Sequence, residues 1–504
     1  MSTKMKHPDH PTKISPYAIH ENDKNRWNRP TMGEEETGPH HWHSGAHISP
    51  VIIFPVFLRR PSRIGGSPSR PGPVPGAIRA FGSSGQDQWK RTAMPVPAHY
   101  LSCPLVSILL PETSHTIRQV NGHREPSGNY MHIHRFAVQS VEELDENLGK
   151  SRCFSPTLAF LFTSPSLGVE ECTGLIRSAG FPFFGCTTAG EILADDGHAP
   201  VYEQSAVCCL LDPPPSAFSV RLFDRAGGSS TGLGEQVGRW GSSLFERPAF
   251  ILAVSGLTND GEAIIRGMQG VLPEGTVIVG GLAGDDNAFE QTTAFSHQGL
   301  SHDGVVVLAL DTSHIRLSSF TTSGWQGVGN EMLVTSSEGN VVKSIDGKLP
   351  VELVSEYLNI DKDDIIATTL SFPMLVTRPD GSETLRTALS ADFGTGYLTY
   401  AGSVPEGSVI RFSSSFGFET IDATIRELKE YHGKNPDADL VILFDCCARH
   451  QAAGNRVNDE IRAISDCWKV PVAGFFTYGE IGHKGTGTCD LFNETLSLAL
   501  LKFR

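Results

Sequence analysis

Leu440-Val-Ile-Leu-Phe444 is one of three short apolar runs that decide the fold of this 504-residue chain. The other two runs are Leu158-Ala-Phe-Leu-Phe162 and Phe250-Ile-Leu-Ala-Val254. Continuous apolar runs of about five residues indicate strands that are covered on both faces. Their recurrence predicts an internal repeat in which each copy starts with a buried strand.

An amphipathic helix is predicted after each run, because apolar residues recur there at helical spacing. Before the second helix, Asn259 and Glu262 stand at the spacing of a capping box. The apolar faces consist of Val169, Cys172 and Ile176 in the first copy, Ile264, Met268 and Val271 in the second, and Val457, Ile461, Ile464 and Trp468 in the third.

A second strand then leads into a glycine turn in each copy. The turns span residues 185–192, 280–286 and 474–481, and in each a second glycine is followed by a carboxylate. Two further strands follow the first two turns, over residues 206–211 and 218–223 and over residues 305–310 and 315–320. Because the links between these strands are short, they predict antiparallel hairpins. The last copy ends in a strand over residues 496–501.

The order strand, helix, strand, glycine turn, strand, strand predicts an α/β fold with mixed β-sheets and packed helices. Two lobes built from these units are expected, over residues 131–346 and 347–504, joined near Asp346. Residues 331–420 are rich in strand patterns and lead into a helix that carries Ile421, Ile425 and Leu428.

Residues 1–130 differ in composition from the rest of the chain. Pro, Gly, Ser, His and Arg dominate there, so too little apolar surface is available to offset chain entropy, and we expect a disordered extension. Ordered patterning begins with a strand over residues 132–138, and we hypothesise that Met131 is the start of the protein in the cell. The histidines at positions 40, 41, 43 and 47 have no cysteine partners, which favours adventitious metal binding over a metal site.

Charge and cysteine usage exclude several classes of function. The net charge is −15, and residues 131–504 hold 26 Lys and Arg against 47 Asp and Glu. Such an acidic body repels phosphate backbones, so no nucleic-acid partner is expected. The apolar run at residues 51–58 is broken by Pro55 and is far shorter than the roughly 20 residues that cross a bilayer. Ten cysteines without a CxxC pair, several of them inside apolar runs, indicate a reducing, cytoplasmic location.

The glycine turns suggest a binding function. Glycine lets a backbone approach a ligand closely, and backbone N–H groups at strand ends can take a carboxylate or a phosphate. Glu191 or Glu480 could then face an ammonium group, which together would suit an amino acid. The residues leave a structural alternative open, in which the glycines make tight turns and the carboxylates cap nearby backbone amides.

No cofactor or metal is indicated, and an enzyme is not the favoured class. The GxGxxG dinucleotide fingerprint and a Walker lysine are missing from the turns. Cys186 and Cys447 stand at strand ends, where a thiolate could act with His450 or be activated by Arg449. A structural or ligand-lining role is favoured for both cysteines. A thiol-dependent or Ntn-like hydrolase and a protein-binding scaffold without ligand are the alternatives.

These motifs, in this order, resemble the FIST family, a two-part bacterial sensory domain. The similarity covers about residues 131–504. Its N-terminal part rests on Gly185-Cys-Thr-Thr-Ala-Gly190-Glu191, Gly280-Gly-Leu-Ala-Gly284-Asp285, Gly324-Trp325 and Asp346-Gly347. Its C-terminal part rests on Cys446-Cys-Ala-Arg449, Gly474-Phe-Phe-Thr-Tyr-Gly479-Glu480-Ile481 and Asn493-Glu-Thr495.

The resemblance implies a sensory domain for small ligands, amino acids among them, in intracellular signal transduction. No kinase, cyclase or receptor helix is recognisable in the chain, so the expected output runs through a separate partner such as a histidine kinase or a cyclic-dinucleotide enzyme. The expected ligand-binding residues are Cys447, Arg449, Thr477, Tyr478, Gly479, Glu480, Asn493, Thr187, Thr188, Gly190, Glu191, Gly281 and Asp285. We expect Arg449 to fork onto a ligand carboxylate and Glu480 to face its ammonium group. The alternative is a structural ion pair between these two residues.

Overall fold

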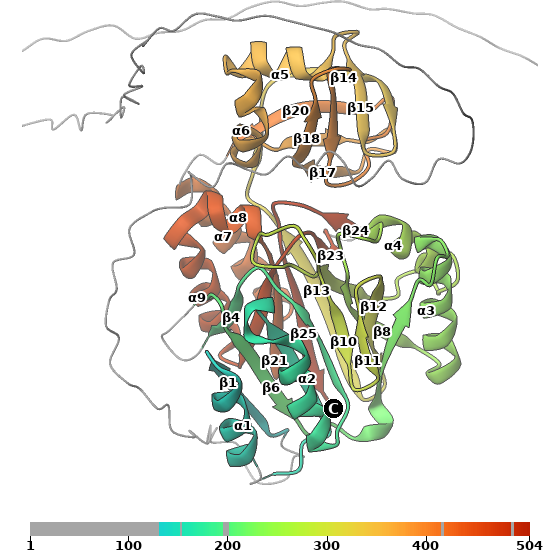
Figure 1. The fold of residues 1–504 in the computed structure, drawn as a ribbon, viewed down its shortest axis with the longest axis vertical. Helices are drawn as coiled ribbons and strands as arrows, with labels where there is room; N and C mark the ends of the chain where they lie inside the picture. The colour runs from blue at the N-terminus through green and yellow to red at the C-terminus, as the bar shows by residue number, and fades with distance from the viewer. Residues whose placement is uncertain (1–130, 152–153, 195–200, 415–417, 485–487) are drawn as a thin grey trace, which may run out of the picture. The chain divides into compact units, whose positions relative to one another are not determined.

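The computed structural model describes residues 131–151, 154–194, 201–414, 418–484 and 488–504 (Figure 1). The predictions for residues 1–130, the histidine group included, lie outside these ranges. The first predicted strand and helix are present as β1 (Ile133–Val138) and α1 (Val141–Lys150). Ser140 caps α1 by accepting a hydrogen bond from the Glu143 amide.

The predicted threefold repeat is confirmed. In every copy the two strands that flank the helix pair in parallel. The copies are β2 (Leu158–Thr163), α2 (Val169–Ala179) and β3 (Phe183–Thr187); β8 (Pro248–Val254), α4 (Gly261–Gln269) and β9 (Ile278–Leu282); and β21 (Leu440–Cys446), α8 (Cys447–Ala453), α9 (Val457–Trp468) and β22 (Val472–Thr477).

The predicted apolar helix faces are buried in α2 and α9. In the second copy two details differ from the prediction. Helix α4 ends before Val271, and its N-cap is Asp260 rather than Asn259, because Asp260 accepts the Ala263 amide at 3.0 Å. Glu262 is buried and paired with arginines elsewhere in the chain, so it does not close a capping box.

Each copy is completed by an antiparallel strand beside its first strand. These closing strands are β6 (Ala206–Leu211), β12 (Gly304–Asp311) and β25 (Leu496–Phe503). The strand that precedes each copy, namely β1, β7 (Phe218–Asp224) or β13 (Ile315–Thr322), pairs with the other edge of the closing strand. Three similar units result, in the strand orders β1-β6-β2-β3, β7-β12-β8-β9 and β13-β25-β21-β22.

The antiparallel hairpins predicted for residues 206–223 and 305–320 are wrong. Strands β6 and β7 follow each other in sequence but belong to different sheets, and so do β12 and β13. Both edges of β6 are already occupied by β1 and β2. The link after β6 carries Pro213, Pro214 and Pro215, which have no N–H for a ladder. The short links therefore move the chain from one sheet to the next.

The hairpin that follows each glycine turn pairs with a strand of a different copy. Hairpin β4–β5 (Glu191–Ala194 and Val201–Tyr202) joins β22, hairpin β23–β24 (Glu480–His483 and Cys489–Phe492) joins β9, and hairpin β10–β11 (Ala294–Ser296 and Gly299–Ser301) joins β3. The exchange is a closed cycle of three. Two of the three sheets that take part in this exchange therefore contain strands from both sides of Asp346, so the proposed division at this residue is a division of the sequence rather than of the sheets.

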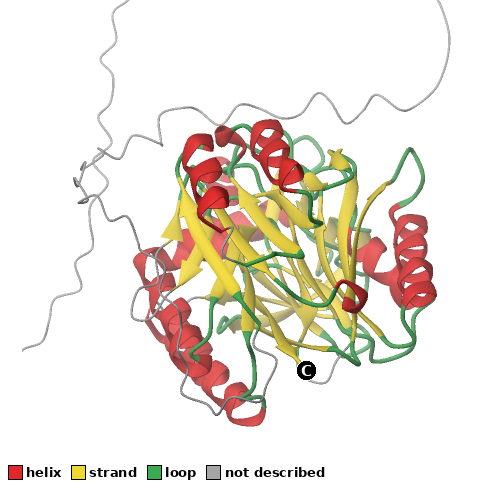
Figure 2. Cartoon of the chain, turned by 90° about the horizontal axis from the view of Figure 1, so that it is seen from below, coloured by secondary structure: helices red, strands yellow, loops and turns green. Residues whose placement is uncertain are grey.

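The three sheets share one hydrophobic core, and helices cover their outer faces (Figure 2). Along β2, Leu158, Phe160 and Phe162 enter the shared core, whereas Ala159 and Leu161 pack with residues of α1 and α2. The same alternation recurs in β8, against α3 (Ser230–Leu244) and α4, and in β21, against α7 (Phe418–Lys434) and α9. Burial on both faces explains why these strands are continuous apolar runs.

The first glycine of each turn serves strand packing. A Cβ at Gly185, Gly280 or Gly474 would collide with a carbonyl oxygen of the parallel neighbouring strand. None of these three glycines needs the left-handed backbone that only glycine adopts readily. Their repetition therefore reflects the close approach of two strands rather than the approach of a ligand.

Residues 326–414 form an insert within the third copy, between β13 and α7 (Figure 1). Its strand order is β17-β16-β20-β14-β15-β19-β18, and it has a hydrophobic core of its own. Its elements are β14 (Gln326–Glu338), β15 (Val341–Ile345), α5 (Pro350–Leu358), α6 (Ile365–Ser371), β16 (Met374–Thr377), β17 (Glu383–Arg386), β18 (Ala388–Asp392), β19 (Tyr397–Tyr400) and β20 (Val409–Ser414).

A buried ion pair connects the insert to the repeat. Arg386 of β17 donates to Glu262 of α4, and both side chains are buried. The Ser403 amide donates to the other oxygen of Glu262 at 3.1 Å, and Arg386 also donates to the Leu491 carbonyl at 3.1 Å. Glu262, which the sequence suggested as a capping residue, is thus an anchor for the insert.

The strand glycines provide a test of the fold. We expect Gly280→Ala to lower the free energy of unfolding by about 1–3 kcal/mol, because the new methyl group overpacks the β8–β9 pair. Gly174→Ala is the control, since nothing lies within 4 Å of its Cβ position in α2, and it should raise stability by about 0.5–1 kcal/mol. Urea unfolding measures both changes. A Gly280→Ala protein as stable as wild type would contradict the packing role.

Candidate functional site

The three glycine turns contact one another through their backbones. The first turn bonds to the third, the third to the second, and the second to the first. Between the first and third turns, the Ala189 amide donates to the Phe476 carbonyl and the Phe476 amide to the Gly190 carbonyl. Between the third and second turns, the Leu282 amide donates to the Gly479 carbonyl and the Tyr478 amide to the Leu282 carbonyl. Between the second and first turns, the Gly284 amide donates to the Thr187 carbonyl and the Asp286 amide to the Thr188 carbonyl. Many of the amides that were expected to face a ligand are therefore donated to a neighbouring turn.

Glu191 and Glu480 occupy equivalent, fully buried positions in the first and third copies. Each carboxyl accepts one hydroxyl from its own turn and one from the residue before the closing strand. The donors are Thr188 and Ser205 for Glu191, and Thr477 and Thr495 for Glu480. Burial raises the pKa of both carboxyls to about 8, so the neutral form predominates at pH 7.

Asp285, the carboxylate of the second turn, closes the loop that follows it. It accepts the amides of Phe289, Glu290 and Gln291 at 2.7–2.9 Å. The Tyr478 hydroxyl donates to the same carboxylate, and the Phe289 ring stacks on the Tyr478 ring with centroids 4.6 Å apart. Asp285 therefore fits the structural alternative, in which a turn carboxylate caps backbone amides.

Gly281 and Thr477 are packed against each other. A Cβ at Gly281 would lie 2.6 Å from the Thr477 methyl carbon. Gly281 also pairs with Glu480 across the β9–β23 ladder. These predicted site residues are brought together, but they form the contact between two sheets.

Arg449 is fully buried in α8, and each of its three nitrogen atoms donates a hydrogen bond. Its Nε and Nη2 atoms fork onto Glu460 of α9 at 3.0 and 2.6 Å. Nη2 also donates to Thr424 at 2.8 Å, Nη1 donates to the Ser323 carbonyl, and the guanidinium lies over the Trp325 ring. The fork that was expected to hold a ligand carboxylate holds Glu460, and the expected alternative partner, Glu480, bonds to threonines instead.

Glu460 was missed by the sequence reasoning, although a signal for it existed. It lies beside the apolar face of α9, between Val457 and Ile461. A carboxylate at a core-facing position needs a buried partner. That partner, Arg449, precedes it by only eleven residues.

Buried acidic side chains are concentrated in the third copy. Asp445, Glu480 and Glu494 are fully buried, and we call them the acid cluster. Burial raises the pKa of Asp445 well above its ordinary value and that of Glu494 to about 8. The register places Thr163 of the first copy at the position of Asp445, since each residue is the last to pair with the closing strand. The symmetry of the repeat is thus broken by a buried acidic residue at this end of β21.

Asn493 and Cys447 lie close to the acid cluster. Asn493 is buried in the loop before β25, directly before Glu494. Cys447 is buried at the start of α8. A hydrogen bond with Cys447 and burial raise the pKa of Cys446 well above its ordinary value, and burial does the same for Cys186. Raised thiol pKa values are the opposite of what a nucleophilic cysteine needs.

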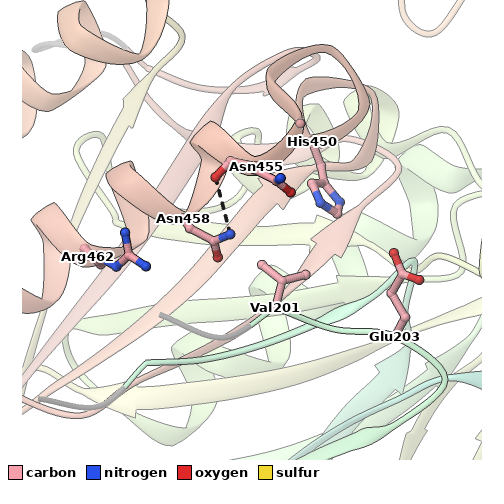
Figure 3. A pocket seen from close by; sticks show the side chains of 7 residues that line it. Val201, Glu203, His450, Asn455, Asn458 and Arg462 are labelled. Atoms are coloured by element: carbon pink, nitrogen blue, oxygen red, sulfur yellow. Dashed lines mark hydrogen bonds between the residues drawn. The ribbon is translucent and has the colours of Figure 1, made fainter. Parts of the chain in front are cut away.

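An open surface pocket of about 490 Å³ lies next to this end of the third copy (Figure 3). The imidazole of His450 stacks on the Phe476 ring of the third turn, with centroids 4.2 Å apart. Arg462 and Glu203 flank Val201 from opposite sides. The lining residues are Val201, Glu203, His450, Gly454, Asn455, Asn458 and Arg462. The sequence reasoning missed this pocket, because Val201 and Glu203 reach it from a segment about 250 residues away from the others.

Within the described ranges, no group of three or more His, Cys, Asp or Glu side chains is arranged to hold a metal ion. None of the helices in these ranges is long and apolar enough to cross a membrane. The eight cysteines in the same ranges are free thiols.

Comparison with known proteins gives a family and uncharacterised relatives. The models of the FIST N domain and the FIST C domain match residues 157–348 and 350–483. The uncharacterized protein Rv0628c of Mycobacterium tuberculosis is 24% identical over 384 residues, which cover 73% of this chain and 96% of the relative. The uncharacterized protein Mb0898c of Mycobacterium bovis is 24% identical over 239 residues, which cover 45% of this chain and 60% of the relative.

Truncation of Arg449 tests its structural role. We expect Arg449→Ala to lower the free energy of unfolding by about 3–5 kcal/mol, because it leaves Glu460 buried without its partner. Arg239→Ala removes an exposed helical ion pair with Glu235, and this control should cost only about 0.3–0.5 kcal/mol. Urea unfolding measures both. A loss below 1 kcal/mol for Arg449→Ala would mean that the pair is not structural.

The raised carboxyl pKa values predict a pH effect on stability. Glu191 and Glu480 hold their protons in the folded protein up to about pH 8, whereas their ordinary pKa is 4.5. Their contribution is therefore fully present below pH 4.5 and is lost as the pH rises through about 8. Glutamine imitates the protonated acid, so the double variant Glu191→Gln, Glu480→Gln should gain stability relative to wild type between pH 5 and pH 8. Urea unfolding at both pH values measures this gain, and an equal difference at both would contradict it.

Proposed function

Since this chain belongs to the FIST family, whose domains are regarded as sensory domains of signalling proteins, we propose that it senses a small molecule in intracellular signal transduction. The proposed ligand is an amino acid, and the proposed location is the cytoplasm, where free thiols persist. The output passes to a separate protein, for which a histidine kinase or a cyclic-dinucleotide enzyme is the proposed class.

The observation that carries this proposal is the surface pocket beside the third turn. Arg462 supplies a cation and Glu203 an anion, on opposite sides of Val201 (Figure 3). Asn455 and Asn458 add amide donors and acceptors to the lining. A carboxylate that pairs with a guanidinium and an ammonium group that pairs with a carboxylate are the two ends of an amino acid.

His450 connects the pocket with the residues that the sequence singled out. Its ring lines the pocket and stacks on Phe476, which is hydrogen-bonded to Ala189 and Gly190 of the first turn. Burial lowers the pKa of His450, so the ring is neutral at pH 7 and packs as a flat, weakly polar surface. A ligand that contacts His450 therefore acts on a side chain that is packed against the interlocked turns.

In this proposal the buried residues of the third copy support the site. Arg449 and Glu460 fix helix α8 against α9, and both helices contribute pocket residues. The hydrogen bond from Thr477 to Glu480 lies within the third turn, which carries the Phe476 ring that stacks on His450. The raised pKa of the Cys186 thiol gives no support to the alternative of a thiol-dependent hydrolase at that residue.

A thermal-shift panel of the twenty amino acids on the full chain tests the proposal. A ligand that binds the folded protein at 100 times its Kd should stabilise it by about 2.7 kcal/mol and raise the melting temperature. Arg462→Ala and Glu203→Gln should abolish this shift, whereas Arg239→Ala, on the distant helix α3, should leave it unchanged. A wild-type protein that responds to no amino acid would refute the ligand class. An undiminished shift in both pocket variants would refute the pocket.

A further inference from the structure

The third copy holds more buried acidic than basic side chains. Asp445, Glu460, Glu480 and Glu494 are fully buried around Arg449. Arg449 lies 3.8 Å from Asp445, but its fork is directed at Glu460. The acid cluster therefore shares Arg449 with Glu460, and a buried carboxylate that is not fully compensated costs several kcal/mol.

Acceptor atoms in and beside the cluster also lack hydrogen-bond partners among the described residues. They are both carboxyl oxygens of Asp445, Oε2 of Glu494 and Oδ1 of Asn493. All three side chains are at least nine-tenths buried. Buried polar atoms are almost always paired in folded proteins, so unpaired acceptors from three residues in one region indicate a missing donor.

The first copy shows that this arrangement is not required by the fold. Its buried acid, Glu191, has both oxygens satisfied by Thr188 and Ser205. The residue before Ser205 is Gln204, which is exposed and uncharged, whereas the residue before Thr495 is the buried Glu494. Both adopt a left-handed backbone, with φ of 52° and 56°, so they are structural equivalents. The additional acids are therefore specific to the third copy.

We propose that Asp445, Asn493 and Glu494 bind a small organic cation with several N–H donors, of the primary amine or guanidine class. Such a group supplies the missing hydrogen bonds and the missing positive charge together. The proposal deepens the proposed sensory function, since it gives the sensor a second ligand chemistry, but the site is separate from the surface pocket.

The insert closes one side of this site. The Thr387 hydroxyl of the insert donates to Oε1 of Glu494 at 3.1 Å, while Oε2 is unpaired. Thr387 directly follows Arg386, which anchors the insert on Glu262. Cation binding at Glu494 is thus in contact with the insert, which is the part of the chain that distinguishes the third copy from the other two.

Without the cation, protons neutralise the cluster. Burial raises the pKa of Glu480 and Glu494 to about 8. A bound cation favours the ionised carboxyls, so binding near pH 7 releases protons, and the affinity should rise as the pH increases through about 8. This linkage separates binding at the cluster from binding at an exposed acidic surface, where carboxyls are already ionised.

Titration calorimetry and thermal shift of the full chain with putrescine and agmatine test the proposal. Tetramethylammonium is the control ligand, because it carries the charge without N–H donors. We expect putrescine or agmatine to raise the melting temperature and to release protons, detected as a dependence of the binding heat on the buffer's ionisation enthalpy. Tetramethylammonium should do neither.

Variants locate the site. Asp445→Asn and Glu494→Gln should each weaken binding at least tenfold, and Glu494→Gln serves alone if Asp445→Asn does not fold. Glu191→Gln is the matched control in the first copy and should leave the affinity unchanged. No response to either amine, or a response that survives Glu494→Gln, would overturn the proposal. An amino-acid response that depends on Arg462 alongside no amine response would leave the sensory function standing and refute only this site.

Discussion

The free edge of the second strand in each copy is the constraint on which the rest of the structure depends. Strands β3, β9 and β22 each have a partner on one side only within their own copy, and an unpaired buried edge leaves backbone donors and acceptors unsatisfied. Each edge is covered by the hairpin of another copy. Because the three exchanges form a closed cycle, no copy can complete its sheet without the others. The glycine turns lie where the chain crosses between sheets, which explains why they are hydrogen-bonded to one another.

Comparison of the three copies distinguishes features that the fold requires from features that need another explanation. What recurs in all three copies, such as the strand glycines at 185, 280 and 474, belongs to the fold. What occurs in one copy needs another reason. The buried acid cluster, the Arg449–Glu460 pair and the insert are all confined to the third copy, and the surface pocket lies at the same end of its strands. The departure from symmetry is therefore the strongest pointer to function in this chain.

Arg449 and Glu480 show how far site prediction could go. The sequence identified both as ionisable residues at strand ends. The structure places Glu480 at the start of β23 and Arg449 in helix α8, which directly follows β21. Their partners could not be read from the sequence, because burial decides them. Once buried, each group must be satisfied by whatever donor or acceptor the packing brings within reach, and these are Glu460 for Arg449 and Thr477 with Thr495 for Glu480. The role of the turn residues in ligand binding stays a prediction.

The sequence by itself determined the repeat, with the two parallel strands and a helix of each copy, and the family, because each rests on local periodicity or on short motifs. The side chains of a run such as residues 440–444 point alternately into two apolar environments, so the run is apolar whichever strands pair with it. The spacing of Val457, Ile461 and Ile464 is sufficient to indicate a helix face. Only the tertiary structure decided which strands pair, because β6 and β7 are neighbours in sequence and yet complete different sheets. It also decided the pocket, which joins Glu203 to His450. The physical reason is that hydrogen-bonding edges and buried charges are satisfied through space, by residues that no local pattern connects.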